Sequence, residues 1–471
     1  MGNQSTACPR LIFMTDPTLT EDNLCRLALA LIGRFGGSYA DAMRRLEQLR
    51  LHVVVGSDVA TSPALQAALL TAVNAGKRAF LGGVTVDLRA DGNLLLPWSH
   101  ATTLSAVIAE LGGVIAQAPS SELLHTLCLG NASSQALDAL SVWVADWRGG
   151  VAPAASGFSL SGRQDFPPAG VMAVALGLAR GFVQLTGLST HFIERPSGLS
   201  LWRPDLMFDD PNAVGPKLEF LPQHLWLAGL GHLGQAYVWN LCLLPYQTPG
   251  ETSIFLQDFD HVVQGNKSAG LLCEDNSPGI LKTRLCMKWL EARSFQTRLV
   301  ERRFDETLRL QTDEPMVALC GFDSIVPRLA LSHAPFKLII DCGIGDSHES
   351  FDHLSIYTFP DASRRPEQIW GSSGASDTPT NQHLLAAFDK KQTCGVLAET
   401  MARKAVATSF VGAFAGSLAI AEVLRGLHNG TRCEAAAYHL RSNSSPRVSM
   451  LQEAYAARAA FAGCVNVSAP T

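Results

Sequence analysis

The sequence LWLAGLGHLGQAYVWN, residues Leu225 to Asn240, decides the fold of the chain around it. A short apolar run is followed by Gly229, Gly231 and Gly234 and then by a pattern typical of a helix. Glycines with this spacing, between a strand and a helix, let backbone N–H groups approach a phosphate at the positive end of the helix. The pattern alone fits a nicotinamide enzyme, a flavoprotein, an ATP-using enzyme or a tight turn that binds nothing.

Length and composition favour a globular protein with two domains. The chain has 471 residues, 47% of them hydrophobic and 17% charged, and a formal net charge of -5. This length exceeds one ordinary core, and the charge argues against a nucleic-acid surface, which usually needs a basic face. The cysteines form no Cys-x-x-Cys pair, which favours reduced thiols over disulfides or structural zinc. Because the start of the chain lacks a secretory pattern, we expect a cytoplasmic protein.

Two apolar stretches have the length of a membrane span but are predicted to be buried helices. They cover residues 169–188 and 405–424, and they contain Arg180 and Glu422 respectively. Small residues dominate both stretches, which suits a helix packed closely against a sheet better than a helix in lipid. We therefore expect no membrane partner.

Both halves of the chain alternate predicted strands with predicted helices. In the first half, residues 51–55 form a predicted strand. Residues 62–76 form a predicted helix with Ser62 as N-cap and Gly76 just after its end. A strand then returns, and this spacing predicts a βαβ unit with a parallel sheet. The second half repeats the plan around the glycine turn.

A segment rich in proline, glycine and aspartate separates the halves. We predict an α/β protein with one Rossmann-type domain at residues 1–205, a linker at 206–222 and a second domain at 223–471. From residue 343 to residue 400 the alternation stops, which predicts a long excursion of the kind that is often functional. Each half ends in a similar small-residue helix. The fold is therefore predicted to be a duplication in which one copy lost its phosphate loop.

Three side chains that follow the glycine turn and Asp258 favour ATP over a nicotinamide. Asp258 follows the second strand, where a carboxylate can bond a ribose hydroxyl in either kind of site. Asn266, Lys282 and Asp323 follow it in order. Amide and ammonium donors hold phosphate oxygens and a carboxylate holds Mg²⁺, and a nicotinamide site has little need of them. The set predicts ATP and Mg²⁺.

In these residues the chain resembles the ThiF/MoeB and ubiquitin-activating enzyme superfamily, whose members adenylate the C-terminal glycine of a ubiquitin-like protein. The resemblance covers residues 225–426. The residues that carry it are Gly229, Gly231, Gly234, Asp258, Asp260, Asn266, Gly279, Lys282, Asp323 and Arg328.

The resemblance implies a role for most of these residues. The glycine turn and Asp258 would hold the adenosine and ribose, with Asp260 also at the nucleotide. Asn266 and Lys282 would contact the phosphates, and Asp323 would bind Mg²⁺. The first half resembles an inactive copy of the same domain, as in the two-domain members of the superfamily.

Two features bear on the supply of arginines to the site. Family members usually carry an arginine three residues after the asparagine, but that position is Ala269 here, so the contact is missing or comes from elsewhere, with Lys267 as a candidate. In two-domain members the inactive half lends an arginine from its N-terminal helix. Arg26 is our candidate for that arginine, and Arg34 is the alternative.

A cysteine nucleophile is implied as well. Ubiquitin-activating members pass the acyl group to a cysteine as a thioester, which requires an accessible thiolate. Cys394, in KKQTCGVLAET, resembles a reactive cysteine of ThiF that precedes Gly-Val, and Cys342 is the alternative. A conjugating enzyme would take the acyl group next.

These observations predict a ubiquitin-like-protein activating enzyme. The duplicated architecture resembles the activating enzymes of bacterial ubiquitin-like conjugation (Bil-type) operons linked to phage defence. Three alternatives stay open at this point: a sulfur-carrier-protein adenylyltransferase of the ThiF/MoeB type, an NAD-dependent oxidoreductase, and a scaffold that binds a ubiquitin-like protein without adenylating it.

Overall fold

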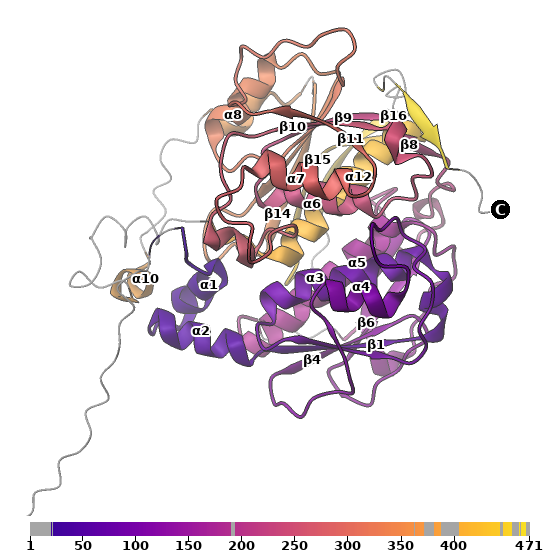
Figure 1. Cartoon of the computed structure of the whole chain (residues 1–471), viewed down its shortest axis with the longest axis vertical. Helices are drawn as coiled ribbons and strands as arrows, with labels where there is room; N and C mark the ends of the chain where they lie inside the picture. Colours follow the sequence, from indigo (N-terminus) through magenta and orange to yellow (C-terminus); the bar gives the residue numbers. More distant parts are fainter. Residues whose placement is uncertain are drawn as a thin grey trace, which may run out of the picture.

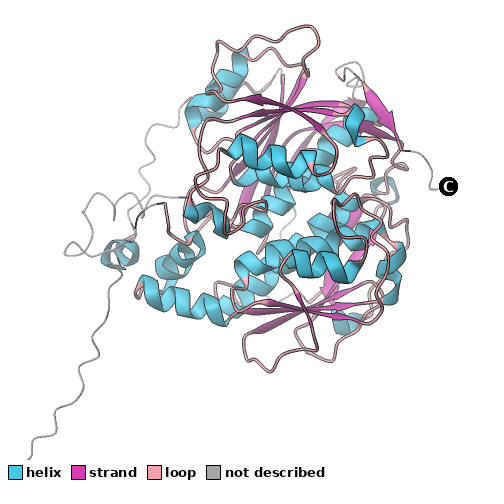
Figure 2. Cartoon of the chain, in the orientation of Figure 1, coloured by secondary structure: helices cyan, strands magenta, loops and turns pink. Residues whose placement is uncertain are grey.

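Two α/β halves pack with their helices facing each other and their sheets on either side (Figure 1; Figure 2). The prediction of two Rossmann-type α/β halves is confirmed. The structure is a computed structural model, and it describes residues 20, 22–189, 194–361, 363–371, 381–387, 405–442, 446–454, 461 and 463–467.

The first half is built on a sheet with the strand order β3-β2-β1-β4-β5-β6-β7. The strands from β3 to β5 are parallel, and β6 and β7 continue the sheet antiparallel. The order reverses between β1 and β4, the kind of point where such sheets bind ligands. Its elements are α1 (Arg26–Phe35), α2 (Tyr39–Gln48), β1 (Arg50–Val55), η1 (Ser57–Thr61), α3 (Pro63–Ala79), β2 (Val84–Leu88), α4 (Leu104–Glu110), β3 (Val114–Ile115), β4 (Leu124–Leu129), β5 (Leu140–Ala145), β6 (Arg148–Pro153), η2 (Ala154–Ser156), α5 (Pro167–Thr186), β7 (Ser197–Ser200) and η3 (Pro211–Ala213).

The second half has the strand order β11-β10-β9-β12-β13-β14-β15-β16, parallel from β11 to β13 and antiparallel beyond. Its order reverses between β9 and β12. Its elements are β8 (Phe220–Pro222), β9 (His224–Ala228), α6 (His232–Cys242), η4 (Pro249–Glu251), β10 (Ser253–Gln257), η5 (Gln264–Ser268), α7 (Lys282–Glu291), β11 (Gln296–Val300), β12 (Val317–Cys320), α8 (Ile325–Leu329), η6 (Ala330–His333), β13 (Leu338–Ile344), β14 (His353–Phe359), α9 (Pro366–Trp370), α10 (Gln382–Ala387), α12 (Ser409–Leu427), β15 (Thr431–His439), β16 (Arg447–Ala454) and β17 (Cys464–Asn466).

The two small-residue helices, α5 and α12, pack against each other at the centre of the molecule, beside α3 and α6 (Figure 1). Both are long and apolar enough to cross a membrane, but their most apolar stretches are 89% and 100% buried inside the protein. The prediction that they are buried core helices is confirmed. Glycine allows α5 to approach α3 closely, because a Cβ at Gly170 of α5 would lie 1.9 Å from the carbonyl oxygen of Ala64 of α3.

Helix α3 begins where the sequence predicts and ends later. The Ser62 hydroxyl accepts a hydrogen bond from the Leu65 N–H at 3.1 Å, so the predicted N-cap is confirmed. The predicted end at Gly76 is wrong, because the helix continues to Ala79. A Cβ at Gly76 would lie 2.6 Å from Leu51 Cδ2. Glycine here serves close packing of the helix on β1.

Part of the predicted excursion at residues 343–400 is regular. Residues 353–359 form β14, which pairs with β13 and β15, so the expectation of an irregular stretch is wrong for them. Their side chains alternate in burial, a period-2 pattern that the polar sequence on both sides obscured. Farther along, α10 contacts α1 of the first half. Cys394 lies outside the described residues.

Candidate functional site

The glycine turn joins β9 to α6 and leaves one backbone position open. Gly229 has a φ of 78°, and its N–H donates to the Gln257 carbonyl at 3.0 Å. A Cβ at Gly229 would lie 2.8 Å from the Gly321 carbonyl oxygen, and one at Gly234 would lie 2.3 Å from that of Gly229. A Cβ at Gly231 would meet no described atom within 4 Å. The first and third glycines therefore serve packing, whereas the start of α6 at Gly231 faces open space; phosphate binding there stays a prediction.

Asp258 connects the glycine turn to the loop after β10. Its Oδ2 accepts the Leu230 N–H at 2.7 Å. Its Oδ1 accepts the N–H groups of Phe259 and Asp260 at 2.7 and 2.8 Å. The residue is 8% exposed. Asp258 thus has a structural role in shaping the turn, and the ribose contact stays a prediction.

Lys282 begins α7 and lies against this loop. Its Nζ is 2.9 Å from Asp260 Oδ2, with 13% of the lysine side chain and 46% of the aspartate side chain exposed. Its backbone N–H donates to the Asp260 carbonyl at 2.9 Å. An ion pair with a half-exposed carboxylate is weak, because water can solvate the carboxylate. The ammonium group can therefore exchange this partner for a phosphate oxygen at small cost.

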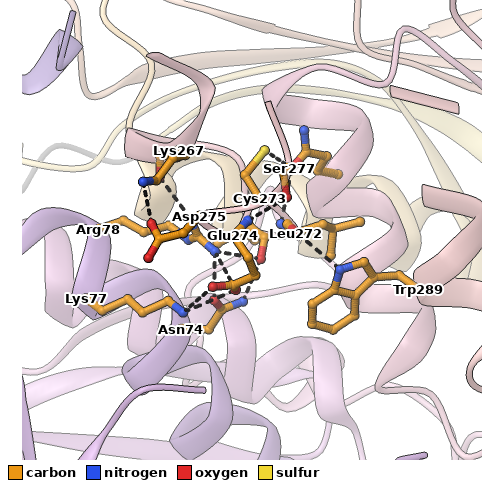
Figure 3. Close-up of polar contacts among 12 residues, drawn as sticks. Asn74, Lys77, Arg78, Lys267, Leu272, Cys273, Glu274, Asp275, Ser277 and Trp289 are labelled. Atoms are coloured by element: carbon orange, nitrogen blue, oxygen red, sulfur yellow. Dashed lines mark hydrogen bonds and ion pairs between the residues drawn. The ribbon is translucent and has the colours of Figure 1, made fainter. Parts of the chain in front are cut away.

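The loop around η5 contains the position where the family arginine is missing. Asn266 Oδ1 accepts the Val263 N–H at 3.0 Å, so its amide holds the turn. Ala269 is 4% exposed. Lys267, the predicted substitute for the missing arginine, forms an ion pair with Asp275 of its own loop (Figure 3). Its ammonium group is thus already paired in this state.

Asp323 belongs to the second half and Arg26 to the first, and each lies where the two halves meet. Asp323 follows β12 and is exposed, and the start of its loop contacts the glycine turn through a hydrogen bond of 2.9 Å from the Gly321 N–H to the Ala228 carbonyl. Burial lowers the pKa of Arg26, and the negative charge of Asp323 opposes this shift. Arg26 of α1 is therefore within electrostatic reach of Asp323. Arg34, the predicted alternative, is exposed in the last turn of α1.

Arg328 holds the Asp323 loop onto the sheet. Its Nη2 donates to the carbonyls of Phe322 at 2.8 Å and Cys342 at 3.2 Å, and its Nε lies 3.4 Å from Asp341 Oδ2. Burial raises the pKa of Asp341 to about 7, and the charge of Arg328 opposes this shift. Sequence reasoning missed Asp341. The one signal was a carboxylate inside an apolar predicted strand.

His232 is a second residue that sequence reasoning missed. Its Nε2 lies 2.7 Å from the carbonyl oxygen of Thr408, the N-cap of α12. Burial lowers the pKa of His232 to about 4, so the ring is neutral near pH 7 and Nε2 carries the proton of this hydrogen bond. The contact links the glycine turn to the helix that follows Cys394 in sequence. The available signal was a histidine between two glycines of the motif.

The described cysteines differ in access to solvent. Cys25 and Cys464 are partly exposed, and the other described cysteines are buried. Cys342, the predicted alternative nucleophile, is fully buried, and burial raises its pKa to about 12. A thiol with neither access nor a stabilised thiolate is a poor nucleophile. Among the described residues, no group of three or more histidine, cysteine, aspartate or glutamate side chains could hold a metal ion.

Comparisons with known proteins cover both halves. The BilD C-terminal domain family matches residues 221–430, and the BilD N-terminal domain family matches residues 50–201. The bacterial E1-like protein BilD of Collimonas sp. (strain OK412) is 37% identical over 403 residues, which is 84% of this chain and 87% of that protein.

Two Escherichia coli proteins are among the similar solved structures. MccB matches with 13% identity and a TM-score of 0.32 over 50% of this chain and 63% of its own, so the chain spans less than two thirds of MccB. The tRNA N6-threonylcarbamoyladenosine dehydratase TcdA matches with 15% identity and a TM-score of 0.28 over 43% of this chain and 85% of its own. The family matches in both halves, together with the Collimonas relative, show that the chain belongs to the BilD family of bacterial E1-like proteins.

Proposed function

We propose that the chain uses ATP and Mg²⁺ to adenylate the C-terminal glycine of a ubiquitin-like protein. Two observations support this proposal at the place where the halves meet. The Gly265 N–H, in the loop that carries Asn266, donates to the Asp22 carbonyl just before α1 at 2.5 Å, and the charge of Asp323 acts on Arg26 of α1. Asp323 follows β12, next to the glycine turn where Gly231 faces open space. A triphosphate needs cations and a carboxylate-bound Mg²⁺ in one place. A nicotinamide does not.

Adenylation would proceed by attack of the glycine carboxylate on the α-phosphorus. A bond forms between a carboxylate oxygen and that phosphorus, the bond to the bridging oxygen breaks, and pyrophosphate leaves. Lys282 and Arg26 would offset negative charge on the phosphate oxygens, and Asp323 would hold the Mg²⁺, which adds positive charge there. Because both reactants are anions, positioning and charge neutralisation would supply most of the rate.

Thioester formation would follow on Cys394. The thiolate attacks the acyl carbon, the bond from that carbon to the AMP oxygen breaks, AMP leaves, and the thiol proton goes to solvent. The burial of Cys342 supports Cys394 over that alternative. A cysteine of a conjugating enzyme would then accept the acyl group. Membership in the BilD family supports a place in bacterial ubiquitin-like conjugation, which we propose to be cytoplasmic and part of antiviral defence.

Two assays test the two steps. ATP–pyrophosphate exchange in the presence of the ubiquitin-like protein from the same operon should detect adenylation. A non-reducing gel should detect an adduct that DTT removes. Exchange without an adduct would favour the sulfur-carrier type of chemistry. The absence of exchange would contradict the proposal, and preferential binding of NAD would then favour an oxidoreductase.

Single cysteine variants locate the nucleophile. Cys394→Ala should abolish the adduct and leave pyrophosphate exchange intact. Cys25→Ala and Cys464→Ala are the matched controls, because these are the partly exposed thiols among the described residues, and each should form the adduct normally. An adduct that persists in Cys394→Ala but disappears in one of the controls would place the nucleophile in the control position.

A further inference from the structure

A buried arginine of the first half contacts the loop of the second half that carries Asn266. Arg78, near the end of α3, is 5% exposed. Its Nη1 donates to the Lys267 carbonyl at 2.9 Å, and its Nη2 donates to the Leu271 carbonyl at 3.1 Å (Figure 3). These two carbonyls lie two residues before and two residues after Ala269, where the family arginine is missing.

Neighbouring groups of α3 complete this contact. Asn74 Nδ2 donates to the Leu271 carbonyl at 3.0 Å, and its Oδ1 accepts from Arg78 Nη2 at 3.2 Å. On the loop, Glu274 lies 3.5 Å from Arg78 Nη2 and 3.2 Å from the ammonium group of Lys77. Amide, guanidinium and ammonium groups from one helix thus converge on a single loop, as Figure 3 shows. We call Asn74 and Arg78 the α3 clamp.

The side-chain donors of the clamp are well suited to bind backbone carbonyl groups. Guanidinium is planar, always charged and offers a fork of donors with fixed geometry, so it can serve two carbonyls at once. The loop from η5 to Glu274 has no place in the sheet. Hydrogen bonds within the loop satisfy some of its carbonyls, such as those of Asn266 and Gly270, but the carbonyls of Lys267 and Leu271 accept from side chains of α3. Removing the donors leaves buried carbonyls without partners, which costs more than the hydrogen bonds themselves contribute.

We propose that Arg78 is a positioning residue for ATP binding: through the carbonyls of Lys267 and Leu271 it fixes the loop that presents Asn266. The first half then acts on the nucleotide site in two ways. Arg26 brings charge to the site, and the α3 clamp holds the loop in which the second half has alanine at position 269. This inference rests on the proposed adenylation, but its physical core, a loop held across the interface of the halves, can be measured without it.

The test compares variants of the full chain. Arg78→Met removes the guanidinium part of the clamp, Arg78→Lys keeps the charge but not the fork, and Asn74→Ala removes the amide part. Thr71→Val is the matched control, because Thr71 lies on the same helix and its hydroxyl accepts the Trp239 Nε1–H across the same interface at 3.0 Å. This hydrogen bond reaches α6 rather than the loop.

Hydrogen exchange and ATP kinetics are the two readouts. Without nucleotide, Arg78→Met should lower the exchange protection of residues 264–275 by about tenfold or more, because it removes two hydrogen bonds from a charged group and one such bond is already worth about tenfold. In pyrophosphate exchange, the KM for ATP should rise by a similar factor and kcat should change less. Arg78→Lys and Asn74→Ala should show smaller shifts of the same kind. Thr71→Val should lower thermal stability and leave both readouts unchanged.

Three results would overturn the inference. One is a folded Arg78→Met variant with the loop protection and ATP KM of the unmodified chain. The second is an equal rise of KM in Thr71→Val, which would show that any loosening of the interface has this effect. If Arg78→Met does not fold, unchanged protection in Asn74→Ala is the third. An unmodified chain that shows no pyrophosphate exchange contradicts the proposed function instead, and the protection data then decide the clamp alone.

Discussion

The two halves arrange their strands alike around a central strand, β1 in one and β9 in the other, but the loops after these two strands differ. After β1, the Ser57 N–H donates to Asn131 Oδ1 at 3.0 Å, and the Asn131 N–H donates to Asp58 Oδ1 at 2.8 Å. A Cβ at Gly130 would lie 2.1 Å from that Asp58 oxygen. After β9, the turn at Gly231 instead faces open space.

The first half thus has the same α/β plan as the second but a different loop after its central strand. In the first half, side-chain hydrogen bonds of Asn131 and Asp58 join the loop after β1 to the loop after β4 and occupy the N–H groups of Ser57 and Asn131. The sheet and the packing helices α3 and α5 remain. Those helices hold the second half, and the first half adds Arg26 at the proposed site. In the proposed function, the first half would therefore support the second half, which would carry out the chemistry.

The largest expected effect concerns Lys282, which lies against the loop after β10 in the second half. Lys282→Ala should lower kcat/KM for ATP–pyrophosphate exchange by about 100- to 1000-fold, because one group that stabilises developing phosphate charge is lost. Asp58→Ala, in the loop after β1 of the first half, should cost about 1 kcal/mol of unfolding free energy and leave ATP–pyrophosphate exchange unchanged. Exchange kinetics and urea unfolding of both variants provide the measurement. A comparable loss of exchange in Asp58→Ala would erase the contrast between the halves.

The second effect concerns a buried carboxylate of the second sheet. Asp341 pairs with the last residue of β12, whereas Val142 pairs with the last residue of β4. Burial raises the pKa of Asp341 from 3.8 to about 7. Between these pH values the native state keeps a proton that the unfolded state has lost, so stability falls as pH rises through this window.

Asp341→Asn should remove this pH dependence and raise the unfolding free energy at pH 8 by about 2–4 kcal/mol relative to the unmodified chain. Denaturant unfolding at pH 5 and pH 8 measures it. Val142→Asn is the control: it should destabilise the protein equally at both pH values, because no proton is involved. An unchanged slope in Asp341→Asn would show that this carboxyl group is ionised throughout.

The third effect distinguishes the open space at Gly231, after β9, from the close packing at Gly56, after β1. Gly231→Ala should leave the melting temperature within about 2 °C and raise the KM for ATP by about tenfold, because the methyl group enters the space of a phosphate. At Gly56, after β1, a Cβ would lie 2.2 Å from Asn131 Oδ1. Gly56→Ala should therefore lower the melting temperature and leave the KM unchanged. The opposite pattern would mean that Gly231 does not face the nucleotide.

The smallest effect lies at the rim of the interface between the halves. Lys77 pairs with Glu274, with 23% and 48% of their side chains exposed. Lys77→Ala should change the unfolding free energy by about 0.5 kcal/mol or less, because exposed ion pairs contribute little, and a salt concentration of about 1 M should abolish the difference. Thermal melts at two salt concentrations measure it. A large effect that persists in salt would show that the lysine, and not only Arg78, holds the loop.

Local patterns predicted much of this molecule. The alternation of strands and helices predicted two α/β halves, and the burial of α5 and α12 followed from their small residues together with Arg180 and Glu422. The motif also predicted the glycine turn between β9 and α6. One pattern failed at Gly76, which lies inside α3 and not after its end; a Cβ there would lie 2.6 Å from Leu51 Cδ2 of β1, so the glycine serves packing.

The sequence by itself determined the division into two α/β halves. It also determined the order in which the glycine turn, Asp258, Lys282 and Asp323 follow one another, because periodicity and spacing are properties of neighbouring residues. Only the tertiary structure decided that the charge of Asp323 acts on Arg26, that Arg78 holds the carbonyls of Lys267 and Leu271, and that Asp58 and Asn131 join the loops after β1 and β4. Each of these contacts joins segments that are far apart along the chain. No local pattern encodes such a partner, since the packing of whole helices and sheets selects it.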